Sequence, residues 1–574
     1  MSSDNNNNNN NDISDNCVVC QVPAQQSCSA CKSVKYCGAE HQRQHWKQHK
    51  NACRPFRIAN DALLGRHLTA TRAIKAGSII FSEAPLIVGP KWYLTDRDEQ
   101  VPVMPCVGCF TPCRMGAHHC PRCRWPACSP DCAGLGNDSL HGFECSILML
   151  GPGPTSTSDI CALIDYYRSD ALVVLKCLLL QRQNPKKWSE LMDMQSHEKE
   201  RIGSELHTDA EKRIVSYLQK NFLQRLRNVE QKSKEKYLNQ YDSTVLHRIC
   251  GIIETNYMCI NLPSGLELSG VYYTACMMEH ACRPNCSFQF DHRNGFKVSI
   301  IAGRDIERGE HLKITYSNML WGTQMRQEHL AITKHFLCKC ERCCDPTEYG
   351  TYFSAMLCIG DVGLDCGGIQ LAKEPLSSIT DWSCNKCPMV ISGEEVRYLL
   401  TQMTAEVEDL LARKPTIKQL EALIEKLSKF LHPNHYHMFS LKHSLIQLYG
   451  TESGYRMPQL DAAQLEKKLH LCQELYAVCQ KLDPDTIRLS IYVGIILYEM
   501  QTVLVEQSKR LLAKQDRQAE DTTKAAAGFK LAREHLLQAA KVLQKELDNV
   551  AGNKMNDAVL ESLNELELLI KDIN

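Results

Sequence analysis

Eight cysteine and histidine residues near the start of the chain have the spacing of zinc ligands. Two knuckles, Cys17-x2-Cys20 and Cys28-x2-Cys31, are followed by four further ligand-type residues. Two thiolates on one tight turn take two corners of a tetrahedral zinc site, and a distant pair closes it. Eight ligands therefore predict two zinc sites, and so short a segment relies on metal for most of its folding energy. The predicted ligands are Cys17, Cys20, Cys28, Cys31, Cys37, His41, His49 and Cys53.

A second array repeats the same order of ligands between residues 106 and 145. It predicts two more zinc sites. Because every one of these four ions has four protein ligands, no position remains for water, and a structural role is favoured over a catalytic one. Cys113, His118 and His119 are surplus and are interpreted as loop residues. The predicted ligands are Cys106, Cys109, Cys120, Cys123, Cys128, Cys132, His141 and Cys145.

Four later cysteines leave two interpretations open. Cys384-x2-Cys387 is a zinc knuckle near Trp382, but its partner pair, Cys358-x7-Cys366, has irregular spacing. The four either bind a further zinc ion or bind no metal.

Composition excludes some classes of protein. The 574 residues include 66 basic and 66 acidic side chains, so no basic excess predicts sequence-specific nucleic-acid binding. No run of apolar residues is long enough for a transmembrane helix. The first sixteen residues are polar and rich in asparagine, which predicts a disordered tail and not a secretory signal. With 31 cysteines and no such signal, we expect a reducing compartment, the cytoplasm and nucleus.

Three further segments carry a family resemblance. Residues 63–90 contain short strand-like runs around Leu64-Gly65-Arg66, and residues 271–316 contain EHACRPN and end in ITY. A Cys338-x-Cys340-x2-Cys343 cluster follows. In this order the segments resemble a split SET domain, and the two cysteine arrays resemble MYND fingers. A finger inserted into a SET domain is typical of the SMYD family, and an additional finger before it resembles the arthropod SmydA branch.

The resemblance implies how the ligands pair. The implied sets are Cys17, Cys20, Cys37 and His41; Cys28, Cys31, His49 and Cys53; Cys106, Cys109, Cys128 and Cys132; Cys120, Cys123, His141 and Cys145; and, for one post-SET zinc ion, Cys282, Cys338, Cys340 and Cys343. His41 stands where the family usually has cysteine.

The resemblance also implies an activity: transfer of a methyl group from S-adenosylmethionine to a lysine of a histone or non-histone protein. Tyr316 matches the catalytic tyrosine. The residues that match the family's cofactor site are Leu64, Gly65, Arg66, Glu279, His280, Tyr316 and Phe336. The resemblance to MYND fingers also implies partners that carry proline-containing peptides.

Departures from the family pattern support an alternative function. His67 replaces a glycine, Glu279 replaces an asparagine, and Lys334 replaces a second channel tyrosine. The Glu279 carboxylate can accept a hydrogen bond from the ammonium of the cofactor but would repel its carboxylate. Lys334 would oppose an incoming lysine. The alternative is a weakly active or inactive adaptor, or a transcriptional co-regulator.

The expected fold class is α+β and multidomain, in a protein that we expect to be a monomer. A split SET β-fold with its inserted finger follows the first finger and precedes a post-SET zinc cluster and a TPR-like helical lobe. The predicted ranges are 1–16 (tail), 17–53 (first finger), 54–105 (SET, first part), 106–145 (second finger), 146–250 (helical insertion), 251–325 (SET core), 326–392 (post-SET) and 393–574 (helical lobe).

Overall fold

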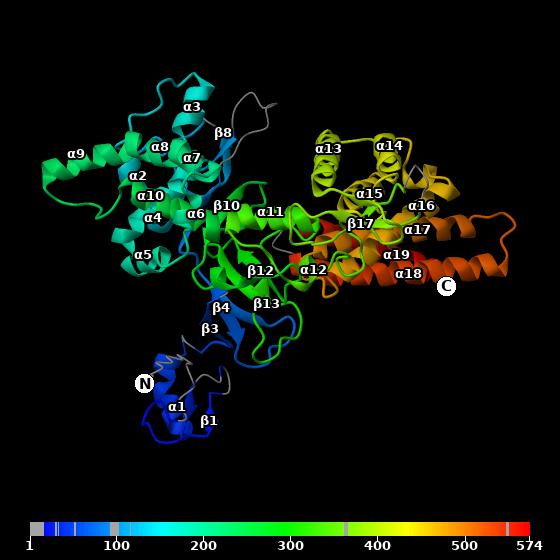
Figure 1. Ribbon diagram of the computed structural model, residues 1–574, viewed down its shortest axis with the longest axis horizontal. Helices are drawn as coiled ribbons and strands as arrows, with labels where there is room; N and C mark the ends of the chain where they lie inside the picture. The colour runs from blue at the N-terminus through cyan, green and yellow to red at the C-terminus, as the bar shows by residue number, and fades with distance from the viewer. Residues whose placement is uncertain are drawn as a thin grey trace. The chain divides into compact units, whose positions relative to one another are not determined.

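The computed structural model describes residues 16–28, 31, 34–50, 53–62, 64–91, 103–114, 116–360, 366–546 and 550–573. The chain divides into two compact units. The first is built from residues 1–82, 277–289 and 299–316, and the second from the rest of the chain. Figure 1 labels many of the elements of both.

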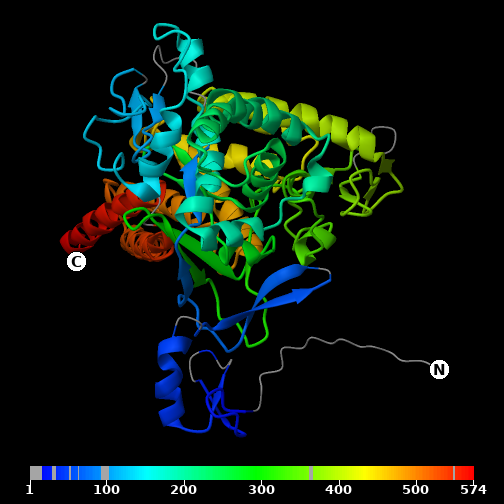
Figure 2. The same cartoon turned by 90° about the vertical axis from the view of Figure 1, so that its left-hand side faces the viewer.

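The first unit begins with a small finger followed by a hairpin. The finger has strands β1 (Gln26–Ser27) and β2 (Lys35–Tyr36) and one helix, α1 (Ala39–His49). Strands β3 (Phe56–Asp61) and β4 (Gly65–Ala70) then pair antiparallel, as the blue arrows in Figure 2 show. At the end of the hairpin, Asp61 Oδ1 accepts the backbone N–H of Leu64 at 2.7 Å.

The rest of the first unit consists of short strands. Strands β5 (Ile79–Glu83), β12 (Cys286–Asp291) and β13 (Lys297–Ala302), of which residues 79–82, 286–289 and 299–302 belong to the first unit, form a sheet in the order β12-β13-β5. Strand β11 (Glu279–His280) pairs parallel with β14 (Lys313–Ile314). The N–H of Leu312 donates to the carbonyl of Leu68 at 2.8 Å, so the segment that leads into β14 lies against β4.

The second unit begins with a finger and a helical insertion. Strands β7 (Val103–Pro105) and β8 (Pro112–Arg114) belong to the finger. Helix α4 (Ser169–Gln183) is buried from Ser169 to Leu180, on every face, as expected for the central helix of a bundle. The other helices of the insertion are α2 (Phe143–Leu148), α3 (Ile160–Tyr166), α5 (Pro185–Met192), α6 (Glu198–Arg201), α7 (Glu205–Ala210), α8 (Ser216–Leu218), α9 (Gln224–Ser233) and α10 (Ser243–Asn256).

Helix α10 continues to Asn256, past residue 250, where the sequence analysis ended the helical insertion. Asp242 caps its start by accepting the N–H of Val245 at 3.0 Å. A sheet of three strands follows, in the order β6 (Ile87–Pro90), β10 (Glu267–Val271) and β9 (Met258–Asn261).

The last part of the second unit is mostly helical. Capping boxes at Ser392, Thr416 and Asp461 mark the starts of α13 (Gly393–Ala412), α14 (Ile417–Leu427) and α16 (Ala462–Leu482). Consecutive helices pack around one extended apolar core, and α17 (Ser490–Leu512) and α18 (Ala519–Leu543) lie side by side in Figure 1. The helices are α11 (Thr323–Lys334), α12 (Glu341–Cys344), α13 (Gly393–Ala412), α14 (Ile417–Leu427), α15 (Tyr436–Leu448), α16 (Ala462–Leu482), α17 (Ser490–Leu512), α18 (Ala519–Leu543) and α19 (Val550–Ile573).

The expected fold class is confirmed: the chain is α+β, with cysteine clusters and a helical C-terminal region. Among the described residues, no helix combines the length and apolar character needed to span a bilayer.

Candidate functional site

The first finger brings its predicted zinc ligands together in the two crossed sets. The donor atoms of each set lie within 4.8 Å of one another. Nδ1 of His41 lies 3.0 Å from Sγ of Cys37, and Nε2 of His49 lies 3.2 Å from Sγ of Cys31. Helix α1 carries both histidines. The donor sets fit tetrahedral zinc, and the histidine at position 41 completes its set as a cysteine would.

The second finger has the same arrangement and adds a buried support. Its two sets of four donors are also within 4.8 Å. Nε2 of His141 lies 3.4 Å from Sγ of Cys123, while Nδ1 lies 3.0 Å from a carboxylate oxygen of Glu144. A carboxylate on the second ring nitrogen orients a zinc-binding histidine. The spacing of zinc ligands in the sequence did not indicate a role for Glu144. This residue is 2% exposed and stands three residues after His141.

The predicted post-SET ligands belong to different units. Cys338, Cys340 and Cys343 lie in the second unit, within 4.8 Å of one another. Cys282 lies in the first unit, where it is buried.

Gly65 has a backbone conformation that favours glycine. Its φ is +65°, in the left-handed region that favours glycine, at the position opposite Asp61 in the β3–β4 pair. His67 takes ordinary strand geometry opposite Ala59, so replacing the family's second glycine adds no left-handed strain there. Leu64 is exposed and Arg66 half-buried beside this turn.

His280 connects the predicted catalytic tyrosine to a predicted zinc ligand. Nδ1 of His280 accepts the backbone N–H of Tyr316 at 2.9 Å, and its Nε2 lies 3.3 Å from Sγ of Cys282. Because Nδ1 is the acceptor, a neutral ring carries its proton on Nε2, facing the sulfur. The hydroxyl of Tyr316 donates to the carbonyl oxygen of Met278. The parallel pairing of β11 with β14 brings the two segments together.

Glu279 has a partner that the sequence analysis did not identify. A carboxylate oxygen of Glu279 contacts Nδ1 of His311 in a short hydrogen bond. The ring of His311 stacks on His67, with centroids 4.6 Å apart and planes at 24°. Nδ1 of His67 lies 3.0 Å from the carbonyl oxygen of Gly65. Glu279 is therefore linked through two imidazoles to the turn at Gly65.

Asn285 is a second residue that was missed, although it lies in the quoted EHACRPN segment. It is 2% exposed. Its Nδ2 donates to Glu310 at 2.9 Å and to the carbonyl of His311 at 2.8 Å, while its Oδ1 accepts the N–H of Lys313 at 2.8 Å. These bonds hold the strand that leads to Tyr316.

The amine of Lys334, which the family resemblance matches to a channel position, is bound at the end of α10 in the structure. Its Nζ donates to the carbonyls of Glu254 and Thr255 at 3.1 and 2.8 Å, at the C-terminal end of α10. It also lies 5.2 Å from the ring centroid of Tyr257. Burial lowers the pKa of Lys334, while the Glu254 carboxylate acts in the opposite direction. Phe336, two residues on, is 36% exposed.

Comparison with known proteins agrees with this architecture. The MYND finger family matches residues 17–53, and the SET domain family matches residues 65–317. The SET domain-containing protein SmydA-8, isoform A, of Drosophila melanogaster is 29% identical over 339 residues, which is 58% of this chain and 65% of that relative. The chain thus spans slightly less than two thirds of that protein.

Two named methyltransferases match over shorter regions. The human histone-lysine N-methyltransferase SMYD3 is 40% identical over 74 residues, 13% of this chain and 17% of that protein. The Arabidopsis thaliana histone-lysine N-methyltransferase ASHR1 is 24% identical over 232 residues, 39% of this chain and 44% of that protein. A MYND finger followed by a SET domain, together with the SmydA-8 and SMYD3 relatives, supports the SMYD family and its arthropod-like branch for this chain.

Proposed function

We propose that this protein is a lysine methyltransferase that uses S-adenosylmethionine. SET-domain relatives named as histone-lysine methyltransferases support the general class. The observation that carries the proposal is the arrangement of Tyr316, His280 and Met278 in the first unit. The backbone of Tyr316 is held by His280, and its hydroxyl meets the Met278 carbonyl.

In this proposal the chain's own residues position the reacting groups. Gly65 lets the backbone approach the cofactor closely, and His280 holds one edge of the site. S-adenosylmethionine, when bound, supplies an activated methyl group on a positively charged sulfur. The oxygens of Tyr316 and Met278 accept weak C–H···O contacts from such a group, and in-line transfer to an amine depends mainly on alignment. The lysine of a protein substrate enters deprotonated, which exclusion of water favours.

Two departures from the family pattern, Glu279 and Lys334, give less support to an inactive protein when their contacts in the structure are considered. The Glu279 carboxylate faces His311, which offsets its charge whenever the imidazole is protonated. The Lys334 amine is occupied by two helix carbonyls, which favours a structural role for it at the end of α10.

The alternative remains an adaptor or transcriptional co-regulator. Its supporting observation is the pair of fingers, whose four closed ligand sets leave no open position for catalysis. Trp46 on α1 is 46% exposed, an aromatic surface of the kind that receives a proline-containing peptide. In either function we propose that the fingers and the helical lobe, which we interpret as TPR-like, recruit partner proteins in the cytoplasm and nucleus.

The direct test is methyl transfer. Purified protein with radiolabelled S-adenosylmethionine is expected to label a lysine-containing peptide library, and the same library with lysine replaced by arginine is expected to stay unlabelled. Tyr316→Phe keeps the ring and removes the hydroxyl, so the rate should fall at least about 100-fold. Equal labelling by wild type and Tyr316→Phe would exclude the assigned role of Tyr316. No labelling by either protein would favour the adaptor.

A further inference from the structure

The four cysteines that the sequence left undecided gather at one end of a small sheet in the second unit. The sheet has the order β15 (Met356–Leu357), β16 (Ile369–Ala372), β17 (Trp382–Cys384) and β18 (Val390–Ile391). Cys358 follows β15 directly, Cys366 precedes β16, Cys384 ends β17, and Cys387 lies in the loop before β18. The register places Gln370 opposite Cys384, so three strand ends converge.

The distances between sulfur atoms fit shared coordination of a metal ion. Sγ of Cys358 lies 3.6 Å from Sγ of Cys387, and Sγ of Cys366 lies 3.6 Å from Sγ of Cys384. With zinc–sulfur bonds of about 2.3 Å, the edge of a tetrahedral site is about 3.8 Å. A disulfide would need sulfur atoms at about 2.05 Å. The observed spacing therefore matches the edges of a tetrahedron and not two covalent bonds.

Hydrogen-bond donors surround the sulfur atoms, as thiolate ligands require. The backbone N–H of Gly360 points to Sγ of Cys358 at 3.4 Å, and the N–H of Lys386 points to Sγ of Cys384 at 3.3 Å. The buried side chain of Gln370 donates to Sγ of Cys358 at 3.4 Å. Such donors stabilise the charged form of the sulfur.

The same local geometry occurs in the second finger. There the N–H of Gly108 donates to Sγ of Cys106 at 3.4 Å, with the same offset of two residues as Gly360 and Cys358. Gly368 keeps space beside the sulfur cluster, because a Cβ there would lie 2.3 Å from Sγ of Cys384.

We propose that Cys358, Cys366, Cys384 and Cys387 bind one structural zinc ion, separate from the finger and post-SET sites. Four thiolates suit zinc or iron, and four protein ligands leave no position for a substrate. The irregular interval between Cys358 and Cys366 is accommodated because each of them borders a strand, so the sheet and not a tight turn brings them together.

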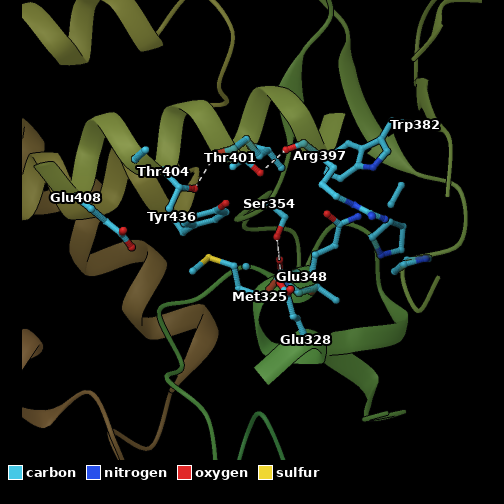
Figure 3. Close-up of a pocket in the computed structure, with 18 residues that line it drawn as sticks. Met325, Glu328, Glu348, Ser354, Trp382, Arg397, Thr401, Thr404, Glu408 and Tyr436 are labelled. Atoms are coloured by element: carbon cyan, nitrogen blue, oxygen red, sulfur yellow. Dashed lines mark hydrogen bonds between the residues drawn. The ribbon is translucent and has the colours of Figure 1, made fainter. Parts of the chain in front are cut away.

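The proposed zinc site lies at the end of the sheet that forms one wall of a cavity. Trp382 on β17 is 2% exposed and belongs to the apolar core of the helical lobe. Together with Ala372 on β16 and with Tyr436 and Arg397 from the neighbouring helices, Trp382 lines a cavity of about 370 Å³, shown in Figure 3. Loss of the ion would free the strands that hold this wall.

Metal analysis of the full-length protein tests the site. Zinc and iron are counted per chain in wild type and in Cys384→Ser/Cys387→Ser, with Cys161→Ser/Cys344→Ser as the matched control at two exposed cysteines. The double variant should lose one zinc ion per chain relative to wild type, and the control should lose none. Wild-type zinc content in the double variant would overturn the proposal, and loss of one iron ion would overturn the choice of metal.

If the double variant fails to fold, a measurement on wild type tests whether the four cysteines bind a metal ion. N-ethylmaleimide modifies free thiols, and peptide mass spectrometry reports the modification of each cysteine. Cys366 and Cys387 are half-exposed, and the proposal predicts slow labelling until a chelator is added. Exposed Cys344 should label quickly in both conditions. Equally fast labelling of Cys366, Cys387 and Cys344 without chelator would show that no metal is bound.

Discussion

His280 holds Tyr316 by its backbone: Nδ1 of the imidazole accepts the tyrosine N–H at 2.9 Å, and the two ring centroids are 5.3 Å apart. His280 is therefore a positioning residue for the tyrosine that we assign to methyl transfer. The same imidazole faces Cys282 through Nε2. We therefore expect a substitution of His280 to change the position of Tyr316 more than it changes the rest of the first unit.

His280→Ala removes the acceptor of the Tyr316 N–H. We expect the affinity for S-adenosylmethionine to fall about tenfold, or about 1.4 kcal/mol, measured by calorimetric titration. His470→Ala is the control, because its side chain is 69% exposed and lies in the helical lobe. If both variants bind the cofactor as wild type does, His280 has no positioning role.

Glu279 and His311 should be coupled in cofactor binding. His311→Ala leaves the Glu279 carboxylate without this partner and should weaken binding about tenfold, because the carboxylate then repels that of the cofactor. Glu279→Asn removes the repulsion and should tighten binding about tenfold, or about 1.4 kcal/mol.

The double variant decides whether the two residues act together. In Glu279→Asn/His311→Ala, loss of His311 should no longer weaken binding, since the charge that it offsets is gone. Additive effects of the two substitutions would contradict this account. Weaker binding by Glu279→Asn alone would show that the carboxylate helps to hold the cofactor.

Glu144 should tune one zinc site of the second finger. Glu144→Ala removes the acceptor at Nδ1 of His141, and we expect one zinc ion to bind about 10–100-fold more weakly in competition with a chromophoric chelator. Glu144→Gln keeps an oxygen acceptor and should show a smaller effect. Identical zinc release from wild type and Glu144→Ala would mean that the ligand is oriented by other contacts.

The helical lobe should be destabilised by acid through a buried histidine. Burial lowers the pKa of His437 to about 4 from an ordinary value of 6.5, and its Nε2 lies 3.0 Å from the hydroxyl of Thr404. The unfolded chain takes up a proton near pH 6.5 and the folded chain only near pH 4, so stability is lost as the pH falls between these values. At pH 5 this one residue costs about 2 kcal/mol.

The measurement compares urea denaturation at pH 7 and pH 5 for wild type and His437→Asn, with zinc present. The variant should lose about 2 kcal/mol less than wild type on acidification. Protonation of zinc ligands affects both proteins equally, so it cancels in the comparison. His470→Asn, at an exposed position, should lose as much stability on acidification as wild type does. If His437→Asn also loses as much as wild type, His437 is not the source of the acid sensitivity.

The zinc ligands of the two fingers were predictable from sequence because each knuckle is local and its spacing reflects one tight turn. Their crossed pairing into sets came from the resemblance to MYND fingers. His280 and Tyr316 were chosen from motifs with a recognisable order, and the structure brings them into contact. Their roles in cofactor binding and catalysis stay predictions. The partners Glu144, Asn285 and His311 were not assigned, because ligand and motif spacing carries no information about which carboxylate, amide or imidazole a fold brings alongside. The family resemblance matched Lys334 to a channel position and could not show that its long side chain reaches the carbonyls of α10.

Calorimetric titration of the wild-type protein with S-adenosylmethionine tests the central claim most directly, because every proposed role of the site depends on this ligand. We predict one binding site per chain with a Kd well below about 1 mM, retained within about threefold by Tyr316→Phe. S-adenosylhomocysteine should compete for the same site. Absence of binding by wild type and by Glu279→Asn at about 1 mM cofactor would contradict the methyltransferase assignment and leave the adaptor.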